Sequence, residues 1–421
     1  MEKYIINGGR KLCGKIVIAP AKNACLPLIA SSILFNNSFV LKNAPKIADV
    51  EVMAEIIKGL GGSFSFTQDG LLINTENIYK YEAECNVCKK ARASFFIAGS
   101  LLSRFREAIV PLPGGCNLGL RPVDIHIDTL KQLGAKVESS ENSVYFDGTN
   151  MKSGKVYFSF PSVGATVNAI CASVFLEGES RLYNVAREPE IVDLCNFLNL
   201  CGCRIGGIGS STLIVNGIKP STRVNKIEYK PIQDRIEAGT FMCAVSACGG
   251  ELNFEYEQIE HLKETIALLK SCGVEIKYER NTVYLKRTGD LTSSSVVADV
   301  YPAFPTDMQS VFCALSLFCN GESVIRDKVF NKRFYFLKDL QRVGAKVEYS
   351  EDGVKILGGY KLEGGEFYVS DLRGGAGMVV ASLAINDKSC INNVELIKRG
   401  YDSFDFKLRS LGADISHSLI N

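Results

Sequence analysis

The stretch "RVGAKVEYSEDGVKILGG" (residues 342–359) decides how this chain is organised. It follows an apolar segment of helical character, and Gly344 stands where that helix would end. Glycine suits the position after a helix because it adopts positive φ without a steric penalty. The residues that follow alternate between apolar and polar side chains, which is typical of a β-hairpin. The stretch therefore predicts a helix that ends near Gly344 and turns into two antiparallel strands.

The same turn recurs along the whole chain, as "GLGGSFSF", "QLGAKVES", "LCGCRIGG", "SCGVEIKY", "RVGAKVEY" and "SLGADISH". Its central glycines are Gly61, Gly134, Gly202, Gly273, Gly344 and Gly412. They are spaced 73, 68, 71, 71 and 68 residues apart. Units of this length are subdomains rather than the short turns of a solenoid. The spacing predicts six repeated units of the same architecture.

Each unit also contains a strand that leads into an almost wholly apolar helix. The residues that mark these joints are Lys22, Arg92, Val163, Arg235, Asp307 and Arg373. A helix that is apolar all round is buried. The predicted architecture is therefore an α/β fold in which sheets enclose helices, repeated six times.

Four of the six joints carry Lys or Arg at or near the start of the helix. Helix N-termini present free N–H groups and a partial positive charge, which suits phosphate and carboxylate ligands. One such residue is more simply explained as a solvated surface charge. Four in equivalent positions of a repeat indicate a site that binds an anion.

Composition limits the possible functions. The chain has 421 residues, of which 46% are hydrophobic and 22% charged, and its net charge is +2. These values are ordinary for a soluble protein of two or three domains and support neither a nucleic-acid nor a membrane partner. The N-terminus lacks an export signal, so we expect a cytoplasmic protein whose fifteen cysteines are reduced. With three histidines and a single C-x-x-C (Cys85 and Cys88), no metal site is expected.

At the joints and loops the sequence resembles the enolpyruvyl transferases, particularly those whose acceptor is UDP-N-acetylglucosamine. The matching stretches are "AKNACLP", "RAS", "LPGGCNLGLRPVDIH", "SVGAT", "AREPEIVD", "PAFPTDMQ", "DLR" and "RGY". The resemblance implies a two-domain inverse α/β barrel built from six β-α-β-α-β-β units. It places the first domain at residues 22–229, the second at 1–21 plus 230–421, and the active site in the cleft between them.

The resemblance also implies an activity. The family transfers the enolpyruvyl group of phosphoenolpyruvate to the 3′-hydroxyl of UDP-N-acetylglucosamine and releases phosphate, by addition and elimination through a tetrahedral intermediate. This reaction is the first committed step of peptidoglycan synthesis. It needs no cofactor or metal, although phosphoenolpyruvate can form a covalent adduct on Cys116. The expected partners are these two small molecules, with no nucleic acid or membrane, and the chain is expected to be a monomer.

The resemblance assigns roles to the residues of this sequence that match the family's motifs. Cys116, in the loop "PLPGGCNLGLRPVD", corresponds to the acid that protonates the methylene carbon of phosphoenolpyruvate. Asp307 corresponds to the proposed general base at the 3′-hydroxyl, and Lys22 and Arg399 complete the catalytic set. The phosphoenolpyruvate-binding positions are Lys22, Asn23, Arg121, Arg333, Arg373 and Arg399. The nucleotide-binding positions are Arg92, Arg121, Pro122, Val123, Asp124, Ile125, Ser162, Val163, Gly164, Asp307 and Val329.

Three positions leave questions open. His126 either orders the adjoining nucleotide-binding run or is a satisfied structural histidine. The family's usual basic residue before "SVGAT" is absent, because the sequence there is Phe160–Pro161, and nucleotide affinity is in doubt. The glycines of "DLRGGAG" (residues 371–377) are expected to loosen the start of their helix.

Two other functions remain possible from the sequence. One is the sister activity that makes 5-enolpyruvylshikimate 3-phosphate on the same fold, which lacks the loop cysteine. The other is a non-catalytic paralogue that keeps the site for binding.

Overall fold

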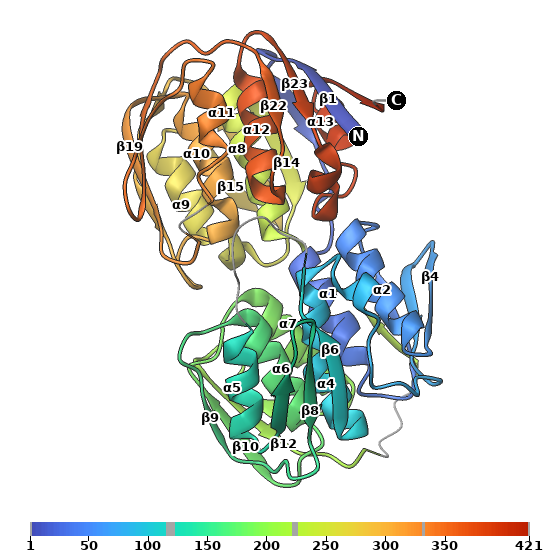
Figure 1. Ribbon diagram of the computed structural model, residues 1–421. Coiled ribbons are helices and arrows are strands. Elements are labelled where there is room, and N and C mark those ends of the chain that lie inside the picture. Colours follow the sequence, from blue (N-terminus) through green and yellow to red (C-terminus); the bar gives the residue numbers. More distant parts are fainter. Residues whose placement is uncertain (1, 115–122, 221–225, 331–332, 420–421) are drawn as a thin grey trace. The chain divides into compact units, whose positions relative to one another are not determined.

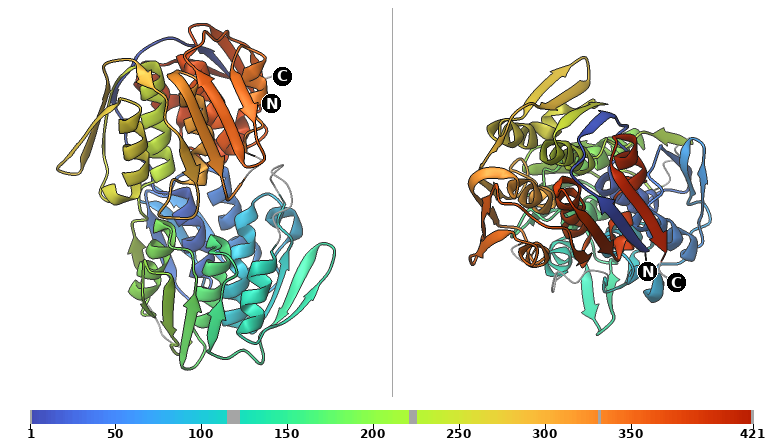
Figure 2. Two further views of the ribbon diagram at one scale, coloured as in Figure 1. Left: turned by 90° about the vertical axis from the view of Figure 1, so that its left-hand side faces the viewer. Right: turned by 90° about the horizontal axis from the view of Figure 1, so that it is seen from above.

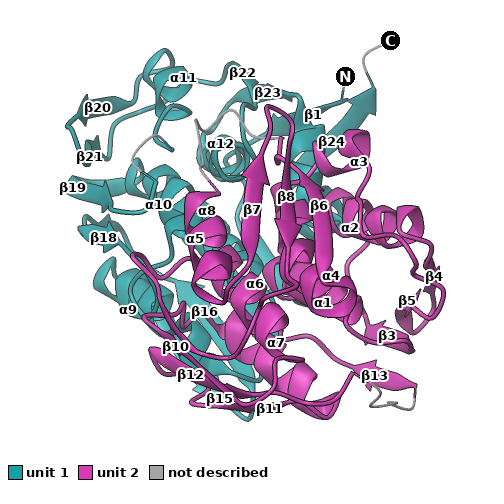
Figure 3. Cartoon of the chain, turned by 60° about the horizontal axis from the view of Figure 1, so that its bottom comes forward, with its two compact units in different colours: residues 1–19, 117–119, 233–421 teal, residues 20–116, 120–232 magenta. Residues whose placement is uncertain are grey.

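The computed structural model describes residues 2–114, 123–220, 226–330 and 333–419. The chain forms two compact units, each described here by itself (Figure 3). Among the described residues, unit 1 comprises 2–19 and 233–419, and unit 2 comprises 20–114 and 123–232. Each unit has its own hydrophobic core.

Helices and strands alternate in both units in the way that the repeat predicts (Figure 1). The helical elements of unit 2 are α1 (Lys22–Ser32), α2 (Ala48–Gly59), α3 (Cys85–Cys88), the 3-10 helix η1 (Arg92–Phe96), α4 (Ile97–Phe105), α5 (Asp124–Gln132), α6 (Val163–Ser173) and α7 (Pro189–Leu200). Its strands are β3 (Ser38–Lys42), β4 (Ser63–Thr67), β5 (Gly70–Asn74), β6 (Glu107–Pro111), β7 (Lys136–Ser139), β8 (Ser143–Asp147), β9 (Lys155–Tyr157), β10 (Glu179–Tyr183), β11 (Arg204–Gly206), β12 (Thr212–Asn216) and β13 (Ile227–Tyr229). In the described part of unit 2 they form sheets of order β13-β3-β5-β4, β6-β8-β7 and β11-β12-β10-β9.

Unit 1 repeats this plan. Its helical elements are α8 (Arg235–Cys248), η2 (Ile259–Leu262), α9 (Lys263–Ser271), η3 (Thr306–Met308), α10 (Gln309–Ser316), α11 (Leu337–Gln341), α12 (Leu372–Ala384), η4 (Val394–Arg399) and α13 (Phe404–Ser410). Its strands are β1 (Glu2–Asn7), β2 (Leu12–Lys15), β14 (Gly250–Glu255), β15 (Glu275–Glu279), β16 (Thr282–Arg287), β17 (Leu291–Thr292), β18 (Val296–Ala298), β19 (Cys319–Asp327), β20 (Lys346–Tyr349), β21 (Gly353–Gly358), β22 (Glu366–Tyr368), β23 (Lys388–Asn392) and β24 (Asp414–Leu419). Its described strands form sheets of order β15-β16-β14-β2, β17-β19-β21-β20 with β18 beside β19, and β22-β23-β1-β24.

The predicted α/β architecture is confirmed. Within each unit the sheets lie outside and the apolar joint helices inside (Figure 2), whereas amphipathic helices such as α9 expose part of their surface. Helices α8, α10 and α12 pack against one another in unit 1, and every residue of α8 from Arg235 to Ala247 is buried. Such burial explains why these helices are apolar on all faces, because each one contacts neighbours on every side.

The six repeat glycines also have the predicted conformation. All six have positive φ, between 89° and 109°, directly after the helix of their unit. Five of them lead into antiparallel hairpins within the described residues. Gly412 leads instead into β24, which pairs antiparallel with β1. The N-terminal strand thus supplies the partner that the last repeat lacks, as the family resemblance implies.

The chain passes between the units at residues 19–20 and 232–233. The predicted boundaries, 22–229 and 1–21 plus 230–421, differ from this division by two or three residues. Ala21 N donates to Ile232 O over 2.7 Å, and this bond holds both segments to unit 2. In unit 1, Asp234 N donates to Ala19 O over 2.8 Å. Hydrogen bonds between residues so far apart in the sequence cannot be predicted from a local sequence pattern, so the exact boundaries could not be predicted either.

The glycines of helix α12 have a packing role that the sequence did not suggest. A Cβ on Gly377 would lie 2.8 Å from the backbone oxygen of Ser310, in helix α10. Gly374, Gly375 and Gly377 are all buried. These glycines allow α12 to approach its neighbours closely, so the expectation that they mainly loosen the helix start misses their contribution to packing.

Candidate active site

The predicted joints coincide with helix starts. Lys22, Arg92, Val163 and Arg235 are the first residues of α1, η1, α6 and α8. Arg373 is the second residue of α12, and Asp307 lies in η3 directly before α10. The candidate residues therefore lie where backbone N–H groups favour an anion.

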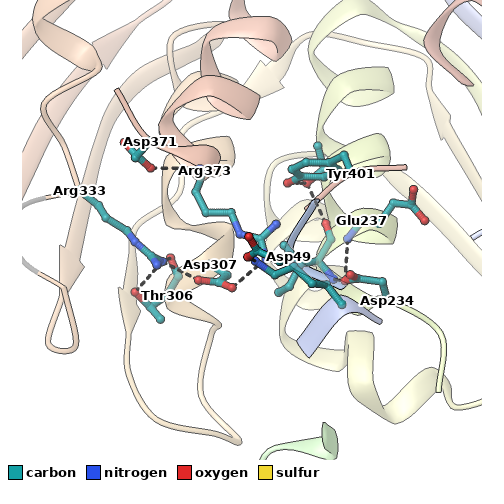
Figure 4. A network of polar contacts seen from close by, with 12 residues as sticks. Asp49, Asp234, Glu237, Thr306, Asp307, Arg333, Asp371, Arg373 and Tyr401 are labelled. Atoms are coloured by element: carbon teal, nitrogen blue, oxygen red, sulfur yellow. Dashed lines mark hydrogen bonds and ion pairs between the residues drawn. The ribbon is translucent and has the colours of Figure 1, made fainter. Parts of the chain in front are cut away.

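Asp307 is the centre of a polar cluster in unit 1 (Figure 4). Its Oδ1 accepts a hydrogen bond from Arg333 Nη1 over 2.7 Å, and its Oδ2 accepts one from Arg373 Nη2 over 2.8 Å. Charge-assisted bonds of this kind are stronger than neutral ones. Residues 307, 333 and 373 are widely separated in sequence, and the fold brings all three predicted residues together.

The two arginines are buried, with 6% of Arg333 and 3% of Arg373 exposed. Within the described part of the chain, Arg333 Nε and Arg373 Nη1 have no hydrogen-bond partner. A buried N–H group without a partner is costly, and in a native structure such a group often marks a binding site. The cluster can therefore accept a further anion.

Two aspartates that the sequence analysis missed fix this cluster. Asp371 caps α12, because its Oδ1 accepts from the backbone N–H groups of Arg373 and Gly374. Asp327 accepts from the Thr306 hydroxyl over 2.7 Å and from the backbone N–H of Val329 over 2.9 Å. Burial raises the pKa of Asp327, although its hydrogen bonds act in the opposite direction. Asp327 thus links Val329, a predicted nucleotide-binding residue, to Thr306, which directly precedes Asp307.

Arg399 ends η4 and is half-buried. Tyr401 follows two residues later, and its ring lies under the guanidinium of Arg373, with 5.4 Å between Arg373 Cζ and the ring centroid. Tyr401 belongs to the motif "RGY", which by itself indicates no role for the tyrosine.

In unit 2, Lys22 forms an ion pair that the sequence did not reveal. Its Nζ lies 3.2 Å from Oδ2 of Asp49, and the two side chains are only 11% and 9% exposed. Asp49 is in the first turn of α2. The sequence signal that was available, an acidic residue at a helix start, is common and points to no particular partner. Asn23 lies beside Lys22 in α1.

The described nucleotide-binding candidates of unit 2 lie at the starts of neighbouring helices. Val123 precedes α5, and Asp124 and Ile125 begin it. Ser162 caps α6, its hydroxyl accepting from Ala165 N over 3.4 Å, and Val163 and Gly164 follow. Helices α5 and α6 pack together, so these two runs are neighbours.

His126 connects these helix starts. Its Nδ1 lies 2.8 Å from Asn168 Nδ2, an atom that also donates to Phe95 O over 2.9 Å. Asn168 Oδ1 in turn accepts from Gly99 N over 3.0 Å. Burial, followed by the charge of Arg92, lowers the pKa of His126 from 6.5 to about 3. His126 is therefore a neutral, hydrogen-bonded histidine in the core, and a role in ordering the run beside it stays a prediction.

Three predicted residues, Cys116, Arg121 and Pro122, lie outside the described residues. Many of the other cysteines are buried thiols, as expected. Burial raises the pKa of several of them to about 12, namely Cys88, Cys171, Cys195, Cys203 and Cys248. Such thiols are poor nucleophiles near neutral pH because only the thiolate reacts.

Two features are absent from the part of the chain that the structure describes. No group of three or more His, Cys, Asp or Glu side chains is arranged to hold a metal ion. No helix in that part of the chain combines the length and apolar character needed to cross a membrane.

Comparison with known proteins identifies the family. The sequence model described as EPSP synthase (3-phosphoshikimate 1-carboxyvinyltransferase) matches residues 6–408. The chain is 37% identical over 415 residues to UDP-N-acetylglucosamine 1-carboxyvinyltransferase 3 of Caldanaerobacter subterraneus subsp. tengcongensis. It is 38% identical over 418 residues to UDP-N-acetylglucosamine 1-carboxyvinyltransferase of Thermodesulfovibrio yellowstonii, and each alignment covers 99% of both chains.

Solved structures share the fold. An enolpyruvyl transferase from Streptomyces tendae superimposes with a TM-score of 0.90 at 21% identity, covering 100% of this chain and 99% of that one. EPSP synthase from Acinetobacter baumannii superimposes with a TM-score of 0.76 at 16% identity, covering 100% of both chains. The chain therefore belongs to the enolpyruvyl transferase family, as predicted. Within this family it is similar along its whole length to the UDP-N-acetylglucosamine 1-carboxyvinyltransferases.

Proposed function

We propose that this enzyme transfers the enolpyruvyl group of phosphoenolpyruvate to the 3′-hydroxyl of UDP-N-acetylglucosamine and releases phosphate. The observation that carries the proposal is the 37–38% identity, over 99% of both chains, to transferases named for this acceptor. Lys22, Cys116, Asp307 and Arg399, the four residues expected to catalyse the reaction, are all present.

In the proposed reaction, Asp307 accepts the proton of the 3′-hydroxyl while the hydroxyl oxygen bonds to C2 of phosphoenolpyruvate. Cys116 donates a proton to C3, which gives the tetrahedral intermediate. Loss of a proton from C3 then restores the double bond and expels phosphate. General acid–base steps of this kind require the groups within hydrogen-bond reach of the transferred protons.

Arg333 and Arg373 would couple the binding of the phosphoenolpyruvate anion to the action of Asp307 as a base. Both oxygens of Asp307 accept from guanidinium groups, so the carboxylate and the two arginines hold one another. An incoming phosphate or carboxylate would accept from the same arginines and release Asp307 toward the acceptor hydroxyl. Together with Lys22, Asn23, Arg121 and Arg399, Arg333 and Arg373 would then stabilise the charge that moves onto the departing phosphate.

The nucleotide would bind through Arg92, the run 121–125, Ser162 to Gly164, Asp307 and Val329. The helix starts at α5 and α6 support this assignment, since their free N–H groups suit a diphosphate. The exposed Phe160 offers no charge at the position where the family usually has a basic residue. We infer that backbone groups carry more of the diphosphate binding here.

The biological setting follows from the reaction. The product would enter peptidoglycan synthesis, so the enzyme would act in the cytoplasm, serve cell-wall formation, cell shape and division, and be a target of fosfomycin. It would work as a monomer without a cofactor.

A second acceptor must be tested, because the description of the matching family model names 3-phosphoshikimate. The experiment measures phosphate release from phosphoenolpyruvate with each acceptor in turn. Release with UDP-N-acetylglucosamine supports the proposal, and release with shikimate 3-phosphate instead refutes it.

A further inference from the structure

The contacts of Tyr401 suggest a function beyond core packing. Only 2% of this residue is exposed, and its ring centroid lies 4.7 Å from that of Phe404. Phe404 in turn packs edge-on against Phe241 of α8, at 5.5 Å between centroids. The tyrosine ring is therefore held in place by other aromatic side chains.

The hydroxyl of Tyr401 is fixed as well. It lies 2.9 Å from Oγ1 of Thr240. Thr240 uses its single proton to donate to Ile236 O over 2.7 Å, so Tyr401 must donate in the bond between them. Burial raises the pKa of Tyr401, while the charge of Arg373 and side-chain hydrogen bonds with Thr240 and Arg373 act in the opposite direction, so the phenol stays neutral and keeps this proton.

The other face of the ring carries Arg373. The guanidinium carbon lies 5.4 Å from the ring centroid, within the range of a cation–π contact. Figure 4 shows the two side chains next to each other, with Asp307 on the far side of the guanidinium. Arg373 thus contacts Asp307 through a hydrogen bond and Tyr401 through the aromatic ring.

The proposed reaction affects these two contacts of Arg373 differently. If Asp307 turns toward the acceptor hydroxyl, Arg373 loses its hydrogen bond to that carboxylate. The contact with the aromatic face does not involve that carboxylate. An arginine side chain has many rotamers, so a contact that persists keeps the guanidinium aimed at the anion.

We propose that Tyr401 is a positioning residue that holds Arg373 ready for phosphoenolpyruvate while Asp307 serves the acceptor. The proposal rests on the proposed function. It predicts that removing the ring weakens phosphoenolpyruvate binding specifically, and that the ring acts through Arg373.

The test compares Tyr401→Leu and Tyr401→Phe with two controls. Tyr401→Leu should raise the KM for phosphoenolpyruvate by about 10- to 30-fold, the effect of losing a buried cation–π contact, and leave the KM for UDP-N-acetylglucosamine within about twofold. Tyr401→Phe keeps the ring and should raise the first KM by less than about fivefold. Phe254→Leu, at a buried ring of β14 in the same core, should destabilise the unit similarly without this effect. Tyr4→Phe, which removes a buried hydroxyl with no partner among the described residues, should change neither KM.

A double-mutant cycle with Arg373→Lys decides whether Tyr401 acts through Arg373. If it does, the effects of Tyr401→Leu and Arg373→Lys are strongly non-additive. Additive effects, or an equal rise in KM for Phe254→Leu, would overturn the proposal and leave Tyr401 a structural residue.

Binding of phosphoenolpyruvate measured by calorimetry separates this proposal from the proposed function. If the unmodified enzyme does not release phosphate with UDP-N-acetylglucosamine, the proposed function fails. The same variants would still test the positioning of Arg373 through their affinity for phosphoenolpyruvate. Weaker binding in Tyr401→Leu alone would uphold the inference, and unchanged binding would refute it.

Discussion

Arg373 donates from Nη2 to Oδ2 of Asp307 over 2.8 Å, which joins the first turn of α12 to η3. With Arg333 on the other oxygen, the carboxylate has a fixed orientation. Asp307→Asn should lower turnover by a factor on the order of 10²–10⁴, because an amide cannot accept the hydroxyl proton. Steady-state kinetics would check this. Asp299→Asn, which alters an exposed pair with Lys328 in the same unit, is the matched control and should retain activity.

The Asp307 variant should also bind phosphoenolpyruvate at least as well as the unmodified enzyme, since the arginines no longer have a carboxylate to hold. Near-normal turnover in Asp307→Asn would remove the general-base role and leave Asp307 as a binding residue.

Asp49→Asn tests the ion pair with Lys22. Because both side chains are largely buried, removing one charge weakens the electrostatic compensation of the other, and breaking a buried pair costs roughly 3–5 kcal/mol. We expect a lower unfolding midpoint and about a tenfold higher KM for phosphoenolpyruvate, as Lys22 loses its orientation. Glu55→Gln, on the same helix and paired at the surface with Lys58, should change neither. An unaltered KM in Asp49→Asn would show that Asp49 does not position Lys22.

His126 should make stability depend on pH. Its pKa is lowered to about 3 in the folded protein, so the unfolded chain binds a proton that the folded one excludes. The contribution of neutral His126 is complete above pH 6.5 and is lost as pH falls toward 3, at no more than about 1.4 kcal/mol per pH unit. Denaturant unfolding between pH 7 and 4.5 should show a shallower pH dependence for His126→Gln than for the unmodified chain. Identical slopes would contradict the assignment.

Cys116 lies outside the described residues, and its role remains a prediction from the sequence. Cys116→Ser should lose most activity, because a hydroxyl is a much weaker acid than a thiol. Cys116→Asp should keep measurable activity, since a carboxyl can still deliver a proton, and should resist fosfomycin. Mass spectrometry after drug treatment should show one adduct on the unmodified chain and none on Cys116→Asp. An adduct on the exposed Cys13 instead would exclude Cys116 as the reactive thiol.

The sequence predicted the parts of the structure that depend on local pattern. The six glycines with positive φ and the buried helices follow from features within a few residues of each position. The joints between strands and helices could be predicted for the same reason, because a basic residue at the start of an apolar helix can be recognised in the sequence.

The partners of these residues could not be predicted. Asp49 and Lys22 are 27 residues apart, Asp307 and Arg373 are 66 apart, and Tyr401 and Thr240 are 161 apart. Each pairing depends on how helices pack, which no short motif records. The family resemblance placed Asp307 and Arg373 near one substrate, but only the structure showed that they bind each other.

The most direct test of the account measures phosphate release from phosphoenolpyruvate by the purified enzyme, with and without UDP-N-acetylglucosamine. We expect release only when the sugar nucleotide is present, in equal amount to an enolpyruvyl ether at its 3′-oxygen identified by mass spectrometry. A parallel reaction with shikimate 3-phosphate should release none. Phosphate release with shikimate 3-phosphate, or no release with UDP-N-acetylglucosamine from a folded enzyme that binds it, would contradict the account.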